Sequence, residues 1–531
     1  MVAGFRKPEV PRDQLVLWSA RLDDAIPSDH PVRQVAYVLE SEPFAATFRE
    51  WEQSYVLLEG KPPYHPRDLT GLYVYGMMNR IRSSRQLEAA CYNRVDVIWL
   101  MLGQHPDHST ISEFVARHGE QLRGLLRNTL EVGIRAGLVK LEHVSVDGSK
   151  LEADAGKGSV HQKATIAAML AKVDEQIGAL EQEWLQNEAT EAKLFGQEVP
   201  WAPSELGSRD ERVAKLRRTQ ELLKDALAQI ERRGAEGAKC KEIASVTDPS
   251  SRSMKDKEGR SKPNYNTQAA VDQAQGMITA AEVNDRAEDS GQLTPMLEQT
   301  QENCGGLPAE ASADSQYNTG PELAALETMG VKGFLPDSGQ SSACPRTDTP
   351  AAEALAAAQA GETLSDQQWA ALPKDGQGRI VKEAFRYDAQ ADVYVCPMGQ
   401  VLPFQRNSRD QKHWGQAVRG QYGGCPACAT CPRAKVCCSN PSRGRTINRD
   451  QYEQHRERMR ERMKSVAGRS RYKLRRQTVE PRFGYIKRGL GIRRFMRRGI
   501  EKVRTEWSVI CTVVNLGILV RHWPEVVKVL Q

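Results

Sequence analysis

The sequence predicts a mixed α/β core joined to an all-α N-terminal domain, and three observations lead to this fold class. Through residues 1 to about 135, apolar side chains recur every three or four residues, as they do along helices. Strand-like and helical stretches alternate between residues 264 and 335, which is typical of an α/β arrangement. Residues 162–234 return to helical spacing in two runs, so a helical hairpin should interrupt the core.

Length and composition agree with several folded parts. At roughly 150 residues per domain, 531 residues suggest three or four modules. Hydrophobic residues at 40% and charged residues at 27% exclude a wholly disordered or collagen-like chain. The expected parts, in chain order, are a helical N-terminal domain over 1–137, the first part of the core with Asp147 over 138–160, a helical hairpin insertion over 161–240, core strands and a helix with Asp314 over 241–344, a linker and cysteine-rich insertion over 345–445, and C-terminal core helices with Glu480 and a basic face over 446–531.

The N-terminal domain contains the segment PDHSTISEF, which has the composition of a helix start. Ser109 or Thr110 is the expected N-cap, and Glu113 is placed for a capping box with Thr110. Two interpretations of the domain stay open, a structural helical bundle and a helix-turn-helix-like module that binds DNA. The hairpin insertion is more typical of a structural or dimerisation arm than of a catalytic element.

Neither end of the chain predicts export or membrane insertion. The first 20 residues lack the apolar stretch of a secretory signal, so we expect a cytoplasmic protein. The most apolar run lies between Arg504 and Arg521 and holds 16 residues, fewer than the ~20 of a membrane helix. We expect a buried helix there and no membrane association.

Basic residues are concentrated near the C-terminus. The chain has 74 Lys and Arg against 68 Asp and Glu, a net charge of +6. Residues 442–504 hold 22 of the basic and 6 of the acidic residues, a net of +16, so the remainder carries 52 minus 62, or −10. Guanidinium groups bind phosphate oxygens bidentately, so a basic face of this density favours DNA binding over an ordinary solvated surface. The side chains expected to bind DNA are Arg475, Arg476, Arg482, Lys487, Arg488, Arg493 and Arg494.

Three acids are candidates for metal-assisted phosphodiester chemistry. Enzymes that cut or join phosphodiesters commonly hold two magnesium ions between carboxylates. Asp147 follows a predicted strand in VSVDGSK, Asp314 follows ASA, and Glu480 lies within the basic segment. Pro481 leaves two geometries open for Glu480: an N-cap position if Pro481 begins the helix, or a kinked helix if Pro481 lies inside it.

A cysteine cluster precedes the basic segment. Cys396 lies in YVCPMG, and Cys428, Cys431 and Cys437 follow with spacings of two and five residues, with Cys425 and Cys438 at the margins. Four thiolates would satisfy a structural zinc site. An iron–sulfur site has less support, because the ferredoxin pattern would continue with three residues and then Cys-Pro. Reduced, unligated thiols remain the third alternative.

Several segments together resemble a known family. The chain resembles bacterial insertion-sequence transposases of the DDE type, in the branch with a helical N-terminal domain and a cysteine-rich insertion before the catalytic Glu. The resemblance covers nearly the whole length. It rests on PPYHPRDL, SSRQLEAA, PDHSTISEF, VSVDGSKLEA, NYNTQAAVD, NDRAEDSGQLTPML, ADSQYNTG, RRQTVEPRFGYIKRGLGIRRFMRRG and VVNLGILV, in this order.

The resemblance implies a ribonuclease-H-like catalytic core with Asp147, Asp314 and Glu480 as its triad and two magnesium ions as cofactors. In the family's third block, Arg476, Glu480 and Lys487 match the usual spacing, but Lys473 stands where a Tyr is usual and Tyr472 lies one residue early. The resemblance implies that Arg476 and Lys487 contact the DNA backbone. It also suggests zinc on the four cysteines.

The implied activity is metal-dependent cleavage at the ends of an insertion sequence, followed by strand transfer into target DNA. Such enzymes act on double-stranded DNA as homodimers or larger assemblies, here in the cytoplasm and associated with the nucleoid. Two alternatives stay open: a catalytically inactive or domesticated DNA-binding protein of the same fold, and a nuclease without strand transfer. The sequence contains neither a G-x4-G-K-[ST] loop nor an H-E-x-x-H pair, so an ATPase or zinc protease has no local support.

Overall fold

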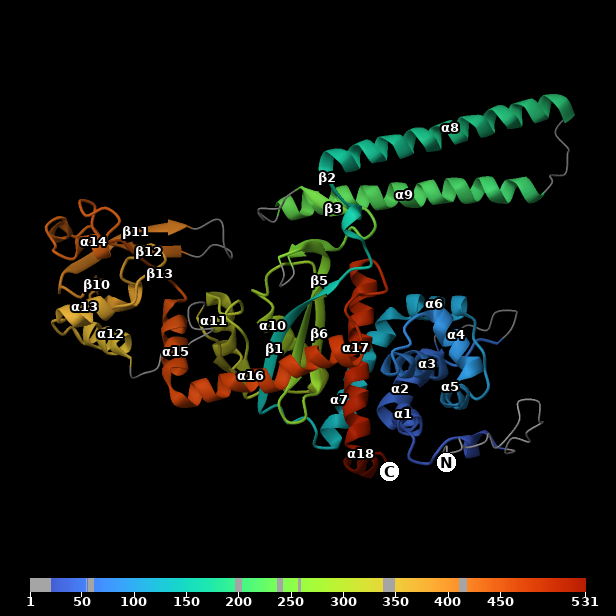
Figure 1. Ribbon diagram of the computed structural model, residues 1–531, viewed down its shortest axis with the longest axis horizontal. Helices are drawn as coiled ribbons and strands as arrows, with labels where there is room; N and C mark the ends of the chain where they lie inside the picture. The colour runs from blue at the N-terminus through green and yellow to red at the C-terminus, as the bar shows by residue number, and fades with distance from the viewer. Residues whose placement is uncertain are drawn as a thin grey trace, which may run out of the picture. The chain divides into compact units, whose positions relative to one another are not determined.

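The computed structural model describes residues 21–53, 55, 62–195, 203–235, 242–255, 259–337, 349–409 and 418–531. The chain divides into two compact units (Figure 1). Unit 1 consists of Met1–Ala136 with Thr512–Gln531, and unit 2 of Gly137–Cys511.

Unit 1 is helical in its described residues, in agreement with the all-α prediction. Asp107 is the N-cap of helix α6, and its side chain accepts a hydrogen bond from the Thr110 backbone N–H at 2.7 Å. The prediction of Ser109 or Thr110 as N-cap was therefore wrong, because the Asp107 carboxylate already satisfies this free N–H group of the first turn. The elements are the 3₁₀ turn Leu22–Ala25, α1 Pro31–Glu40, α2 Glu42–Gln53, α3 Pro66–Met78, α4 Ser84–Asn93, α5 Val95–Leu100, α6 His108–Arg117, α7 Gly119–Arg135, the end of α17 Ile500–Arg521, and α18 Trp523–Leu530.

The C-terminal 20 residues pack within unit 1. Asn515 Nδ2 donates to Thr129 Oγ1 at 3.1 Å, and the ring of Trp523 meets that of Tyr37 edge-on, with 5.6 Å between centroids. The part expected over 446–531 as one group of core helices is thus divided between the two units. Within the described residues, α17 is the one helix long and apolar enough to span a membrane, and 83% of its apolar stretch is buried, as in a core helix.

Unit 2 is built on a mixed sheet, which agrees with the α/β prediction. Its strands are β1 His143–Glu152, β4 Arg252–Lys255, β5 Ser261–Asp272, β6 Ile278–Asn284, β7 Glu310–Ser312 and β8 Lys332–Phe334. The strand order is β6-β5-β1-β7-β8, and β4 pairs with the start of β5. Strand β5 runs antiparallel to both β6 and β1. Strand β7 runs parallel to both β1 and β8.

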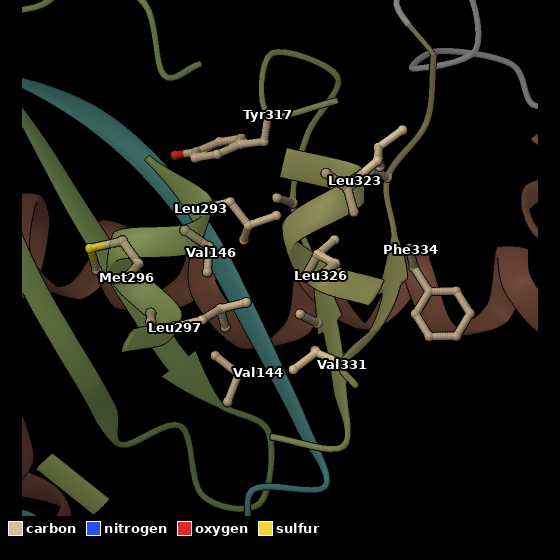
Figure 2. Close-up of a cluster of buried hydrophobic side chains, with 14 of the residues drawn as sticks. Val144, Val146, Leu293, Met296, Leu297, Tyr317, Leu323, Leu326, Val331 and Phe334 are labelled. Atoms are coloured by element: carbon tan, nitrogen blue, oxygen red, sulfur yellow. The ribbon is translucent and has the colours of Figure 1, made fainter. Parts of the chain in front are cut away.

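Helices α10 Leu293–Cys304, α11 Gly320–Thr328, α15 Glu453–Lys464 and α16 Val466–Gly484 belong to the same unit. A single apolar cluster joins the sheet to α10, α11 and α15. Figure 2 shows Val144 and Val146 of β1 between Leu297 of α10 and Leu326 of α11. The burial of both faces of β1 around Val144 to Val146 fixes the position of Asp147, which follows directly.

The hairpin insertion consists of two long helices, α8 Lys163–Phe195 and α9 Pro203–Ala235. Ion pairs and hydrogen bonds join Lys163 to Glu231, Asp174 to Gln220 and Glu181 to Arg217, so the helices run antiparallel (Figure 1). At its base lie the 3₁₀ turn Lys157–Ser159 and a two-stranded sheet of β2 Val160–Gln162 and β3 Ile243–Ser245.

The cysteine-rich insertion has its own sheet and its own core. Five antiparallel strands lie in the order β13-β12-β11-β10-β9, and Tyr394, Leu402, Tyr422 and Ile447 are buried beside them. This sheet ends at Asp450, five residues beyond the expected boundary at 445. The elements are α12 Pro350–Ala360, α13 Asp366–Ala371, the 3₁₀ turn Lys382–Ala384, β9 Arg386–Asp388, β10 Val393–Val395, β11 Val401–Arg409, β12 Val418–Tyr422, the 3₁₀ turn Pro426–Ala429, α14 Ala434–Cys437 and β13 Ile447–Asp450.

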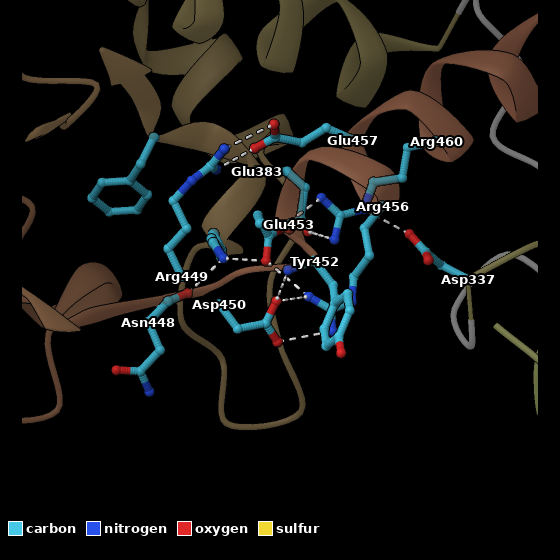
Figure 3. Close-up of polar contacts among 12 residues, drawn as sticks. Asp337, Glu383, Asn448, Arg449, Asp450, Tyr452, Glu453, Arg456, Glu457 and Arg460 are labelled. Atoms are coloured by element: carbon cyan, nitrogen blue, oxygen red, sulfur yellow. Dashed lines mark hydrogen bonds and ion pairs between the residues drawn. The ribbon is translucent and has the colours of Figure 1, made fainter. Parts of the chain in front are cut away.

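A polar network holds the insertion against α15 (Figure 3). Lys382 Nζ lies 2.9 Å from Glu453 Oε2, and Arg449 Nη1 lies 2.6 Å from Glu457 Oε1. Arg460 Nε reaches Asp337 Oδ2, just after β8, at 2.8 Å. Because α15 leads into α16, this network also supports the helix that carries Glu480.

Candidate functional site

The parallel pairing of β1 with β7 brings Asp147 and Asp314 together. Ser145 lies opposite Ser312, and each acid follows its serine by two residues. Asp147 lies on β1, and Asp314 lies two residues past the end of β7, so the parallel pairing brings the two segments side by side. Burial raises the pKa of Asp147, and the negative charge of Asp314 raises it further.

Helix α16 brings Glu480 to the same acids through Arg475. Arg475 Nη2 lies 2.7 Å from Asp147 Oδ1, and Nη1 lies 3.6 Å from Glu480 Oε1. The Arg475 side chain is 13% exposed and that of Asp147 15%, whereas Glu480 is 49% exposed. The structure therefore brings Asp147 and Glu480 to one largely buried guanidinium, with Asp314 on the segment beside that of Asp147.

Burial makes this an unfavourable place for negative charge. It raises the pKa of Asp147 to about 6, even though the charge and hydrogen bond of Arg475 act in the opposite direction. Burial likewise raises the pKa of Asp314, against hydrogen bonds from backbone N–H groups. Carboxylates held together in this way attract cations, but within the described residues no group of three or more His, Cys, Asp or Glu side chains is arranged to hold a metal ion.

Pro481 lies inside a helix, which decides between the two geometries left open by the sequence. Helix α16 continues through Pro481 to Gly484 and is followed by a π-helical turn over Tyr485–Gly489. Proline has no N–H group, so the carbonyl four residues earlier loses its helical partner. After the π turn, Lys487 Nζ donates to Ser149 Oγ at 2.5 Å, and Ser149 follows Asp147 by two residues on β1.

The predicted DNA-binding side chains occupy different environments. Arg475 faces the acids, Arg482 Nη2 donates to the Gln275 carbonyl at 2.9 Å, and Arg494 pairs with Asp154 at 2.8 Å. The remaining three arginines of the set are exposed: Arg476, Arg488 and Arg493. The DNA-binding role of all seven stays a prediction.

The tyrosine that departs from the family spacing lies at the site. Tyr472 precedes Arg475 by three residues on α16 and packs against the core cluster. Burial raises the pKa of its hydroxyl, and the charges of Arg475, Asp314 and Asp147 also act on it. The helix therefore places Tyr472 on the acid-facing side despite its one-residue offset.

Sequence reasoning missed a fourth acid at this site, Asp289. Its negative charge raises the pKa of Asp314, and it accepts hydrogen bonds from the side-chain amides of Asn266 and Gln268 on β5. The signal available in the sequence was an acid inside the segment NDRAEDSGQLTPML, just ahead of helix α10.

The four predicted zinc ligands line one small cavity of about 30 Å³, together with Cys438. The Gln400 backbone N–H donates to Cys396 Sγ at 3.3 Å, which helps to hold this sulfur in place. Burial raises the pKa of Cys396, and the charges of Cys428 and Cys425 raise it further. Burial raises the pKa of Cys437 to about 12, with smaller contributions from Cys438 and Cys396. Four thiols are the donor type that structural zinc takes, but within the described residues these thiols are not arranged as a metal site.

Two family models match the chain. Residues 20–117 match the family described as Transposase domain (DUF772), and residues 395–520 match the family described as Transposase DDE domain. The two matches support an insertion-sequence transposase of the DDE type. No curated protein and no solved structure matches it.

The matches cover the two ends of this transposase. The DDE match includes Glu480 and the four cysteines, whereas Asp147 and Asp314 lie between the two matched regions. The matches support a transposase activity in general, and transposases of the DDE type typically use divalent metal ions. The assignment of the first two acids depends on the geometry of the sheet.

Proposed function

We propose that this transposase binds the ends of an insertion sequence, cleaves them in a metal-dependent reaction and transfers the strands into target DNA. The observation that carries the proposal is the meeting of Asp147, Asp314 and Glu480 around Arg475. The strand order β6-β5-β1-β7-β8, antiparallel and then parallel, supports a ribonuclease-H-like core. Here the first acid lies on β1, the second lies two residues past the end of the adjacent parallel strand β7, and the third lies on helix α16, which packs against β1.

The three carboxylates would hold two magnesium ions, which when bound supply activation of the attacking oxygen and stabilisation of the leaving oxygen. Lys487, beside Ser149 near the acids, would bind a phosphate of the DNA strand that enters the site. Exposed Arg476 would extend this contact along the backbone. Because two ends have to be held together, we propose that the enzyme acts as a homodimer or larger assembly on DNA, in the cytoplasm and associated with the nucleoid.

We also propose that Cys396, Cys428, Cys431 and Cys437 hold a structural zinc ion. The support is their common cavity and the backbone N–H bond to Cys396. Zinc binding would stabilise the small insertion, whose sheet is anchored to α15 through Glu453, Arg449 and Glu457. The catalytic helix α16 follows directly from α15.

The test uses oligonucleotides that carry the terminal sequences, which a search for short inverted repeats in the DNA on either side of the gene would supply. We expect Asp147→Ala, Asp314→Ala and Glu480→Ala each to abolish magnesium-dependent cleavage while end binding stays nearly intact. Glu302→Ala, an exposed acid on α10, is the matched control and should cleave normally. Retained nicking by one of the three variants would remove that residue from the triad.

The same assay separates the alternatives. Cleavage without joined products would indicate a nuclease that lacks strand transfer, and end binding without cleavage by the wild-type protein would indicate an inactive DNA-binding protein. We expect end binding to weaken steeply between low and moderate salt, since the basic face would release counterions from DNA. Affinity that stays flat with salt would contradict the assignment of this face.

A further inference from the structure

We propose that Asp289 is a positioning residue of the catalytic centre, which acts by fixing the loop that carries Asp314. The inference rests on the proposed function, in which Asp314 is a metal ligand. It assigns Asp289 no contact with metal or DNA. Its effect passes through two buried side chains, Gln268 and Tyr317.

The first step is the bond between Asp289 and strand β5. Asp289 Oδ1 accepts hydrogen bonds from Gln268 Nε2 at 2.6 Å and from Asn266 Nδ2 at 2.7 Å. Asn266 and Gln268 are two residues apart on one strand, so their amides project on the same side. One carboxylate oxygen therefore holds both amides.

The second step is the orientation of the Gln268 amide. Gln268 is fully buried; its nitrogen donates to Asp289, and its side-chain oxygen accepts a hydrogen bond from the Tyr317 hydroxyl. Its backbone carbonyl accepts from Trp507 Nε1 at 3.0 Å. A buried amide held at both ends cannot turn without leaving a polar group without a partner, which is costly. Loss of Asp289 would therefore release the amide and with it the Tyr317 hydroxyl.

The third step links Tyr317 to Asp314. Tyr317 is fully buried, and its backbone N–H donates to the Asp314 carbonyl at 3.3 Å. The Gln316 backbone N–H donates to Asp314 Oδ1 at 2.8 Å, and Gln316 Oε1 accepts in turn from the Asp289 backbone N–H at 3.4 Å. Asp289 thus contacts the Asp314 loop directly through Gln316 and indirectly through Tyr317.

Asp289 also lies against the strand that carries Asp147. Gly148 pairs with Gln268 across the β1–β5 ladder, and a Cβ atom at Gly148 would lie only 2.4 Å from Asp289 Oδ1. Glycine at this position therefore allows the carboxylate to approach the backbone next to Asp147. Asp289 therefore lies against both segments that present the first two acids, beside Gly148 through its side chain and at Gln316 through its backbone N–H.

The experiment measures Mn²⁺ binding by the full chain, by electron paramagnetic resonance in the absence of DNA, beside the cleavage assay. We expect Asp289→Ala to weaken Mn²⁺ binding by roughly tenfold or more, as is usual when a partner behind a metal ligand is lost. Asp289→Asn, which keeps an oxygen for both amides, should stay within about threefold of wild type on the same grounds. Tyr317→Phe, which removes the donor to Gln268 but keeps the ring, provides a second variant if Asp289→Ala fails to fold, and should also weaken binding.

The matched control is Asp272→Ala, which removes a buried carboxylate at the other end of β5, where it accepts from the Leu141 backbone N–H at 2.8 Å. We expect this variant to lose stability and to bind Mn²⁺ as wild type does. Wild-type affinity in Asp289→Ala would overturn the inference. A loss in Asp289→Asn as large as in Asp289→Ala would also overturn it, because the charge and not the position would then matter.

The outcomes separate this inference from the proposed function. Absence of Mn²⁺ binding by the wild-type protein would overturn both. Normal Mn²⁺ binding without any strand cleavage would overturn the proposed function alone.

Discussion

Replacing Asp147 by asparagine should stabilise the metal-free protein while abolishing cleavage. Burial raises the pKa of Asp147 from 3.8 to about 6, so the folded protein favours the neutral form. The difference of 2.2 corresponds to about 3 kcal/mol at roughly 1.36 kcal/mol per pKa unit. Asparagine resembles the protonated acid in shape and charge. We therefore expect the free energy of unfolding to rise by up to about 3 kcal/mol at pH 7.5, by linkage.

The sign of the pH dependence provides a second check. A carboxyl whose folded-state pKa is raised destabilises the fold above that pKa, and the penalty disappears as the pH falls through about 6 towards 3.8. The stabilisation by Asp147→Asn should therefore shrink to less than about 1 kcal/mol near pH 4.

The assay is urea unfolding of both proteins with a chelator of divalent cations at pH 7.5 and pH 4. Glu480→Gln is the matched control; its side chain is 49% exposed, so we expect a change within about 0.5 kcal/mol. The reasoning would be refuted if the Asp147→Asn protein were no more stable than the wild type at pH 7.5. It would also be refuted if the gain in free energy of unfolding were as large at pH 4 as at pH 7.5.

Three further predictions concern the metal centres. Arg475 Nη2 lies 2.7 Å from Asp147 Oδ1, so its positive charge competes with a metal ion for this carboxylate. Arg475→Gln should therefore raise Mn²⁺ affinity by roughly tenfold at pH 8. Unchanged or weaker Mn²⁺ binding in an electron paramagnetic resonance titration would contradict this. Wild-type Mn²⁺ affinity should fall by about tenfold for each pH unit below about 6, because Asp147 has to be ionised to bind metal. Calorimetric titrations between pH 7.5 and pH 5 measure this dependence. An affinity that does not change with pH would contradict the prediction. Protein purified without chelator should contain about one zinc ion per chain. Cys428→Ser should lose this zinc and should expose residues 349–450 to proteolysis, because thiolate coordination stabilises the insertion. A zinc content well below one per chain in the wild-type protein would count against the site.

Parts of the fold could be predicted because their signals are local. The strand-like stretches expected between residues 264 and 335 include β5 and β6, where Ala270 lies opposite Ala280, since the residue pattern of a strand is local. The start of α6 was missed by two residues because several side chains in PDHST can cap a helix, and the folded backbone selects Asp107.

Parts of the site could not be predicted because they depend on contacts between distant segments. Arg475 and Arg476 are neighbours of equal charge in the sequence, yet the rotation of α16 buries the first against Asp147 and leaves the second exposed. Asp289 resembles many other surface acids until the register of β5 places Gln268 beside it.

The sequence by itself determined the family, the two fold types and three candidate acids, because each depends on residue type, order and short-range spacing. Only the tertiary structure decided that the strands preceding Asp147 and Asp314 pair in parallel, that Arg475 contacts both Asp147 and Glu480, and that the last 20 residues belong with the N-terminal unit. The physical reason is that strand register and helix packing, which spacing along the chain does not contain, determine which side chains meet.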